Sequence, residues 1–112
     1  MRQSQPILLL TLIAAAAIAE FRFITAAGAV SGIGDHSAGV TQFAADAAGD
    51  AVPVAALGTS VVETGDAFAA DVLLEADADG KAIPFVAGPA LARSLEVSGG
   101  AGEFVEVILL PN

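Results

Sequence analysis

Residues Ala51–Ile83, AVPVAALGTSVVETGDAFAADVLLEADADGKAI, decide the fold of this chain. They form three apolar runs, and the runs are separated where Gly stands beside Asp or Thr, at Thr64–Asp66 and at Asp77–Gly80. Short runs of Val, Leu and Phe bounded by such clusters are typical of β-strands joined by tight turns. Gly80 can supply the positive φ that a hairpin turn often needs, and Asp tolerates that region better than most residues. The segment therefore predicts consecutive strands.

The rest of the chain repeats this pattern of short apolar runs between turn residues. Ala19–Thr25 alternates apolar and charged residues, as a half-buried strand does. The Gly-rich segment Ala26–Gly39 predicts a loop, and Val40–Ala45 predicts another short strand. Leu91–Val97 and Glu103–Leu110 predict a closing pair of strands. About eight short strands with turns every 8–12 residues or so predict an all-β fold, a small antiparallel barrel or sandwich.

Two of the expected strands carry further information in their side-chain pattern. Phe68–Ala76 alternates, with Leu74 on the apolar face and Asp71 and Glu75 on the other. The longest run, Ala51–Glu63, is broken only by Gly58, which we expect to mark a bend or bulge. Apolar side chains occupy both of its faces: Val52, Val54 and Val62 against Leu57 and Val61. We expect such a strand to be buried on both sides, either by a closed barrel or by a neighbouring subunit.

Composition limits the classes of function. The chain has 112 residues, which fits one domain, and 26 of them are Ala, whereas Trp and Tyr are absent. Because each Ala buries little apolar area, the core is shallow and association with other chains would help it. Four basic residues against 13 acidic ones, a net charge of −9, argue against a nucleic-acid partner. Without Cys, the chain has no disulfide, catalytic thiolate or Cys-based zinc site.

The amino-terminal segment MRQSQPILLLTLIAAAAIA, residues 1–19, imitates a secretory signal peptide. Its apolar run Ile7–Ile13 is shorter than the roughly 20 residues that span a membrane as a helix. A single Arg and the early Pro6 make a weak amino-terminal region for a signal. We therefore expect Ile7–Ile13 to be a buried strand that lies against another subunit. On this interpretation residues 1–18 are an apolar arm or first strand, and residues 19–112 are the β-domain.

Two motifs imitate chemical sites. His36, the only histidine, lies between Asp35 and Ser37, but adjacent residues in a flexible loop rarely orient one another as a catalytic triad requires. Glu75–Gly80 resembles the start of a calcium loop, yet the twelfth position, which needs a bidentate Glu, is Val86. We interpret these segments as a solvated loop and a plain hairpin turn. The sequence predicts no enzyme, no cofactor and no metal site.

The order and spacing of these elements resemble the small head-decoration or capsid cement proteins of tailed bacteriophages. The resemblance covers residues 10–112, roughly the whole chain. Five stretches carry it: TLIAAAAIAEFRFIT at 11–25, the Gly-rich loop Ala26–Gly39, DAAGDAVPVAALGTSVVETG at 46–65, EADADGKAI at 75–83 and ALARSLEVSGGAGEFVEVILLPN at 90–112. One departure is Ala70, where the family pattern often has Gly before the Asp that is Asp71 here. Since Ala adopts left-handed geometry less readily than Gly, we expect the local turn to differ.

The resemblance implies a non-enzymatic subunit on the outer surface of an icosahedral phage head, made in the host cytoplasm. Such proteins clamp neighbouring major capsid proteins against internal pressure, usually as homodimers or homotrimers with arms reaching adjacent subunits. The partners implied are the major capsid protein and further copies of this chain, with no nucleic acid and no membrane. We expect the contacts on the arm Met1–Ile13 and the closing strand, through Ile7, Leu8, Leu9, Leu10, Leu12, Ile13, Phe104, Val105, Val107, Ile108 and Leu110.

An alternative remains open at this stage. If residues 1–19 are a signal peptide after all, the chain is an exported β-domain, an envelope or surface binding module that begins near Glu20. The mature amino-terminus separates the two interpretations.

Overall fold

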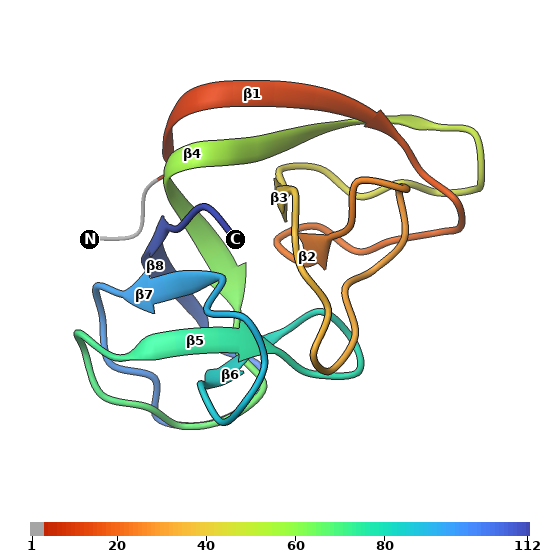
Figure 1. Ribbon diagram of the computed structural model, residues 1–112. Coiled ribbons are helices and arrows are strands. Elements are labelled where there is room, and N and C mark those ends of the chain that lie inside the picture. Colours follow the sequence, from red (N-terminus) through yellow and green to blue (C-terminus); the bar gives the residue numbers. More distant parts are fainter. Residues whose placement is uncertain (1–3) are drawn as a thin grey trace.

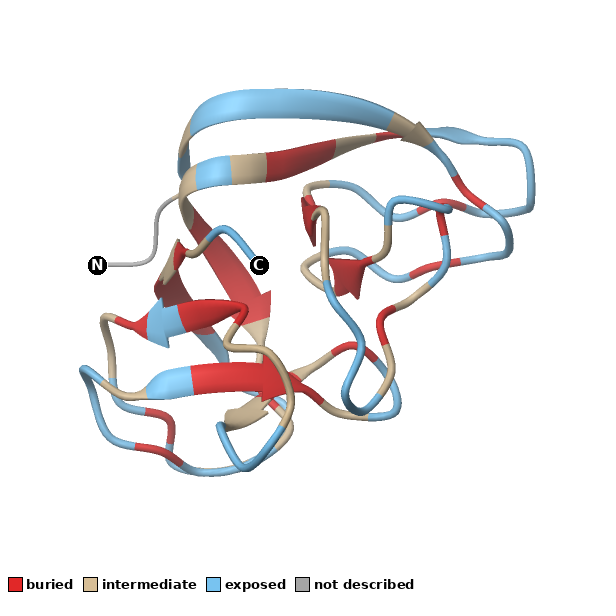
Figure 2. Ribbon diagram, in the orientation of Figure 1, coloured by how far each residue is buried: buried red, intermediate tan, exposed pale blue. Residues whose placement is uncertain are grey.

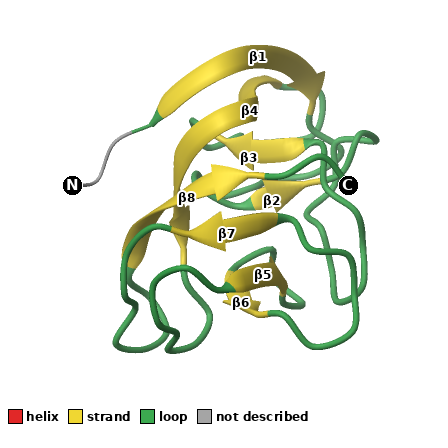
Figure 3. Cartoon of the chain, turned by 60° about the vertical axis from the view of Figure 1, so that its left-hand side comes forward, coloured by secondary structure: helices red, strands yellow, loops and turns green. Residues whose placement is uncertain are grey.

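The computed structural model describes residues 4–112 and confirms the predicted all-β class. Its regular structure consists of strands, and the described residues contain no helix (Figure 3). The eight strands are β1 (Gln5–Ile13), β2 (Phe23–Ile24), β3 (Gly39–Thr41), β4 (Ala51–Glu63), β5 (Leu73–Ala76), β6 (Ala82–Pro84), β7 (Ala92–Ser94) and β8 (Phe104–Leu109).

Strand β4 is the central strand of the fold. All strands belong to one antiparallel sheet with the order β2-β3-β4-β8-β7-β5-β6, and β1 pairs with β4 outside this path. The first part of β4 pairs with β1, and its last residues, Thr59–Glu63, pair with β8 (Figure 1). A single parallel bridge between Thr64 and Ala82 brings β6 back to the end of β4. No continuous ladder closes the described sheet, so the sheet is open, an arrangement that fits either a sandwich or an open barrel.

The predicted bulge lies at Gly58. Its φ of +99° is unfavourable for residues with a side chain, and a Cβ there would lie 2.5 Å from the carbonyl oxygen of Gln5. The register with β1 shifts beside it, after the pair Pro6–Gly58. Ala55 and Val62 are separated by an odd number of positions, which would place them on opposite faces of a regular strand, yet both line one core cluster. The bulge therefore exchanges the two faces of β4 along its length.

This exchange lets β4 serve two core clusters. The larger cluster contains Phe23, Leu74, Leu91 and Val107, together with Ala55 and Val62 from β4. The smaller one contains Ala14, Ile18, Ile24 and Ala45, together with Val52 and Val54 from β4. The prediction that β4 is buried on both faces is confirmed for these residues, although Leu57 remains 38% exposed. Two clusters of this same chain, not a closed barrel, bury them.

Several expected strands are shorter than predicted, and in two of them a residue with positive φ interrupts the strand. Phe21 has φ of 59°, so only Phe23–Ile24 of Ala19–Thr25 forms a strand. Asp71 has φ of 62°, so the expected strand Phe68–Ala76 is reduced to β5. The left-handed position is Asp71 itself, not the preceding Ala70.

The turn Asp77–Gly80 is the predicted hairpin turn and joins β5 to β6. The side chain of Asp77 accepts hydrogen bonds from the backbone N–H groups of Asp79 (2.8 Å) and Lys81 (2.9 Å). Gly80 has φ of 76°, as a tight turn often requires. The carboxylate that resembles a calcium ligand in the sequence thus stabilises the turn.

Candidate interaction surface

The most unusual surface of the molecule is β1. Ile7 is 83% exposed, Leu9 55% and Ile13 58%, and Leu8 and Leu10 are exposed as well. Figure 2 shows this strand as an almost continuous exposed ribbon along the edge of the molecule. The prediction that Ile7–Ile13 is a strand is confirmed, but the prediction that it is buried is wrong within this chain. Only Leu12 packs against the smaller core cluster.

The exposure follows from how β1 is held. Its backbone pairs with β4 at eight positions from Gln5 to Ile13, so hydrogen bonds attach it firmly to the sheet. Within the described residues β4 is the one strand that pairs with it, which makes β1 an edge strand. Natural edge strands are usually protected by charged residues, but QPILLLTLI has none and carries only Pro6 and the bulge beside it. An apolar edge of this length favours contact with another chain.

A shallow groove of about 390 Å³ lies beside β1. Its apolar lining consists of Pro6, Leu9, Phe21, Phe43 and Pro53, and the polar residues Ser4 and Gln42 complete it. Phe43 is 65% exposed and extends the apolar surface of β1. The sequence analysis placed Phe43 inside an expected strand, Val40–Ala45. Because β3 ends at Thr41, Phe43 lies outside the ladder. We call Ile7, Leu8, Leu9, Leu10, Ile13 and Phe43 the β1 surface.

The closing strand contributes less to a contact surface than predicted. Val105 and Val107 are fully buried in the larger core cluster, so their side chains stabilise this chain and do not face a partner. Ile108 and Leu110 are half-buried. Phe104 is 39% exposed and packs edge-to-face on Phe21, with ring centroids 5.9 Å apart. Of the expected contact residues in the closing segment, Phe104 and Ile108 of β8 and Leu110 just after it therefore have accessible area.

Charged side chains from three distant segments of the chain meet at Glu63. Arg22 donates hydrogen bonds from Nε (3.2 Å) and Nη2 (3.0 Å) to Oε1 of Glu63. The Lys81 ammonium lies 3.5 Å from Oε2 of the same carboxylate. Arg22 also donates to the carbonyl oxygen of Asp79 (3.1 Å). Two of the cations in residues 4–112 are thus engaged within the chain, and Arg93 lies exposed on β7.

The side chains beside His36 form hydrogen bonds within their own loop. Ser37 donates its side-chain hydrogen bond to the carbonyl oxygen of Gly39 (2.8 Å), and the Asp35 carboxylate accepts one from the N–H of Gly32 (2.9 Å). Both contacts stabilise the loop around His36, and neither involves the imidazole. In the part of the chain that the structure describes, no cluster of three acidic or histidine side chains could hold a metal ion. Across residues 4–112 no helix is suited to crossing a membrane.

Comparison with known proteins decides the family. The model of a family described as phage cement protein matches residues 1–109. The chain belongs to the phage cement protein family. This membership confirms the resemblance noted in the sequence and assigns a structural, capsid-associated role.

The fold of this family member is also similar to that of a solved phage protein. The crystal structure of the head fiber gp8.5 N base in bacteriophage phi29 aligns with a TM-score of 0.72. The alignment covers 92% of this chain and 93% of that one, at 18% sequence identity. At this identity the likeness concerns the fold. No curated protein matches the sequence.

Proposed function

We propose that this cement protein binds the outer surface of an icosahedral phage head and stabilises contacts between major capsid proteins. The observation that carries the proposal is the β1 surface, in which a charge-free edge strand and the neighbouring Phe43 leave large apolar side chains exposed within residues 4–112. A family whose members associate with capsids supplies the kind of partner. Ile7, Leu9 and Phe43 would be covered by a capsid subunit in the assembled particle.

The same surface can explain self-association, which we propose as a homodimer or homotrimer. β1 exposes apolar side chains on both of its faces, and no strand of residues 4–112 other than β4 pairs with it, which leaves its outer edge open to a further strand. One chain can therefore meet a capsid subunit and a second copy along the same strand. The half-buried residues Ile108 and Leu110 and the exposed ring of Phe104 would extend these contacts.

A deletion of residues 1–12 tests the proposal. It removes most of the β1 surface, but the larger core cluster contains no residue from this segment, so that part of the fold should persist. We expect the shortened chain to show β-type circular dichroism and to lose binding to capsid shells that lack the cement protein. Unchanged occupancy on those shells would refute the role of β1. Antibody labelling of intact particles tests the outer location, because a protein on the inner surface would stay unlabelled.

The alternative of an exported module makes a different prediction about the mature chain. Residues 1–19 include Ala14 and Ile18, which are buried in the smaller core cluster, so their removal would open that cluster. This packing counts against the export hypothesis. Intact-mass measurement on the protein from purified particles distinguishes the two: a chain that begins near Glu20 would favour export, and one that retains β1 would favour the capsid role.

A further inference from the structure

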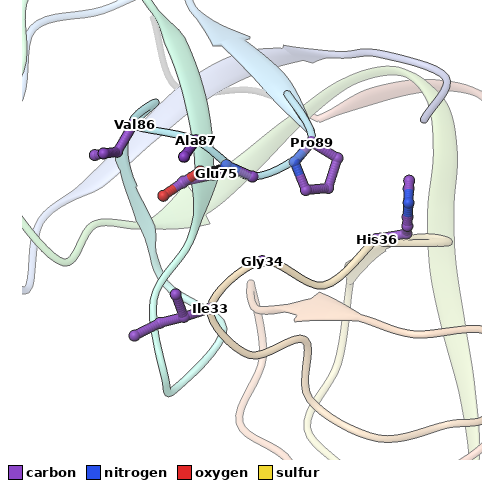
Figure 4. Close-up of a pocket in the computed structure, with 8 residues that line it drawn as sticks. Ile33, Gly34, His36, Glu75, Val86, Ala87 and Pro89 are labelled. Atoms are coloured by element: carbon purple, nitrogen blue, oxygen red, sulfur yellow. Dashed lines mark hydrogen bonds between the residues drawn. The ribbon is translucent and has the colours of Figure 1, made fainter.

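A second groove, remote from β1 in sequence, contains a buried carboxylate. Its volume is about 630 Å³, and it lies between the loop around Ile33 and the loop Phe85–Pro89. Ile33 is 71% exposed and Val86 76% exposed, so both side chains can meet a partner. Figure 4 shows Glu75 beside Val86 and Ala87, with Ile33 on the opposite side of the groove. The groove thus combines an apolar rim with one carboxylate, and His36 also lines it.

Glu75 has the character of a binding residue. It is only 4% exposed, although the alternation of its strand predicted a solvent-facing side chain. Its Oε2 atom accepts a hydrogen bond from the N–H of Gly88 (2.8 Å), and no cation of residues 4–112 pairs with it. A buried carboxylate normally has a positive partner, because its removal from water costs several kcal/mol that one backbone hydrogen bond does not fully offset.

The two loops that line the groove come close together at Gly88. A Cβ on Gly88 would lie 2.8 Å from Oε2 of Glu75 and 3.1 Å from the Cα of Gly34. Glycine at position 88 therefore lets the two loops meet and leaves the carboxylate in place beneath them. The remaining oxygen, Oε1, makes no hydrogen bond within residues 4–112 and is free to accept one.

The Arg and Lys side chains of residues 4–112 do not supply a cation to Glu75, so we look for one on a partner molecule. Arg22 and Lys81 are engaged by Glu63, so within residues 4–112 only Arg93 remains, exposed on a different strand. A second copy of this acidic chain consequently offers few cations. With Oε2 already engaged by Gly88, the carboxylate presents one free oxygen. That arrangement suits the single-point ammonium of lysine better than the two-pronged guanidinium of arginine.

We propose that this groove binds a lysine side chain of the capsid shell, with the aliphatic stem against Ile33, Val86 and Pro89 and the ammonium at Oε1 of Glu75. The inference rests on the proposed function, because it places the lysine on the partner that β1 is proposed to contact. It adds a charged, orientation-setting contact to the apolar one. Contact with a long apolar strand alone defines poorly where the partner binds along the strand. A buried ion pair allows only one alignment of the two molecules.

Binding of purified variants to shells that lack the cement protein tests the inference. Glu75→Gln retains an oxygen that can accept the Gly88 hydrogen bond but removes the charge, and Glu20→Gln makes the same charge change at an exposed position. We expect Glu75→Gln to bind about tenfold more weakly or worse and Glu20→Gln to bind like the wild type. Thermal unfolding of both variants verifies that each is folded.

The outcomes separate this inference from the proposed function. If the wild type fails to bind shells, both are overturned. If the wild type binds and Glu75→Gln binds equally well, only the lysine groove is overturned. Carbodiimide treatment of wild-type particles gives a test that does not depend on any variant, since the reagent joins a carboxylate to a lysine amine as an amide. A cross-link from Glu75 to a capsid lysine supports the proposal. A cross-link only to this chain's own Lys81, or none at Glu75 while other carboxylates react, would refute it.

Discussion

The double substitution Ile7→Ser and Leu9→Ser provides the sharpest test of the β1 surface. Fully burying a Leu or Ile side chain contributes about 1.5–3 kcal/mol. Ile7 is 83% exposed and Leu9 55% exposed, so their complete coverage by a partner would add about 3 kcal/mol to binding. Loss of that amount weakens binding by about 150-fold.

The same exposures predict a small effect on folding. Because most of Ile7 and half of Leu9 are already in water, the two substitutions should together cost about 1.5 kcal/mol of the free energy of unfolding or less. The backbone pairing of β1 with β4 does not depend on these side chains. The double variant should therefore unfold only a few degrees below the wild type while its binding is nearly abolished.

The assay is a binding titration on shells that lack the cement protein, read as the number of copies bound at each free concentration. Val97→Ser is the matched control, since Val97 is 66% exposed but lies outside the β1 surface. We expect the control to bind normally. Wild-type affinity of the double variant, with its fold intact, would refute the assignment of the contact to β1. Equal losses in the control would show that surface hydrophobicity in general, and not this strand, drives attachment.

Two further predictions concern the fold that presents these surfaces. Gly58→Ala should destabilise the protein by about 2 kcal/mol or more, because Ala at φ of +99° is strained and its Cβ would press on the Gln5 carbonyl of β1. Amide hydrogen exchange should then show lost protection concentrated in β1 and β4, and unchanged protection there would contradict the explanation of the bulge. Glu63→Gln should cost about 1–2 kcal/mol in urea unfolding at low salt, because Arg22 and Lys81 lose their shared anion. Added salt should reduce the difference in the free energy of unfolding between this variant and the wild type. A difference that does not change with salt would argue against an ionic origin.

Local chemistry in the sequence was sufficient to predict the strands and turns. The apolar runs of β4 and β8 and the turn Asp77–Gly80 were predicted correctly, since Val-rich runs and Asp–Gly turns encode their own backbone geometry. The prediction that Gly58 marks a bend or bulge was also correct, because glycine inside an apolar run is typical of such a position. The strand ends at Phe21 and Asp71 were missed, because Phe rarely adopts a positive φ and because Asp71, although Asp tolerates that region, stands in an alternating run that favours a strand.

Burial was the property that the sequence predicted least well. The apolar run Ile7–Ile13 and the alternating Val105 and Val107 both read as candidates for a contact surface, yet one is exposed and the others fill the core. An apolar side chain favours burial. Whether it is buried within its own chain depends on the order of the strands in the sheet. That order depends on pairings between distant segments, such as β1 with β4, which no local pattern encodes.

By itself, then, the sequence determined the all-β class, the turns, the acidic net charge and the resemblance to capsid cement proteins, because each depends on residue type and spacing. The tertiary structure alone decided that β1 is an uncovered edge and that Glu75 lies buried under Gly88, beside a loop from the first third of the chain. Both features arise where long-range pairing sets side chains from distant segments beside one another, and the proposed contacts with the capsid depend on them.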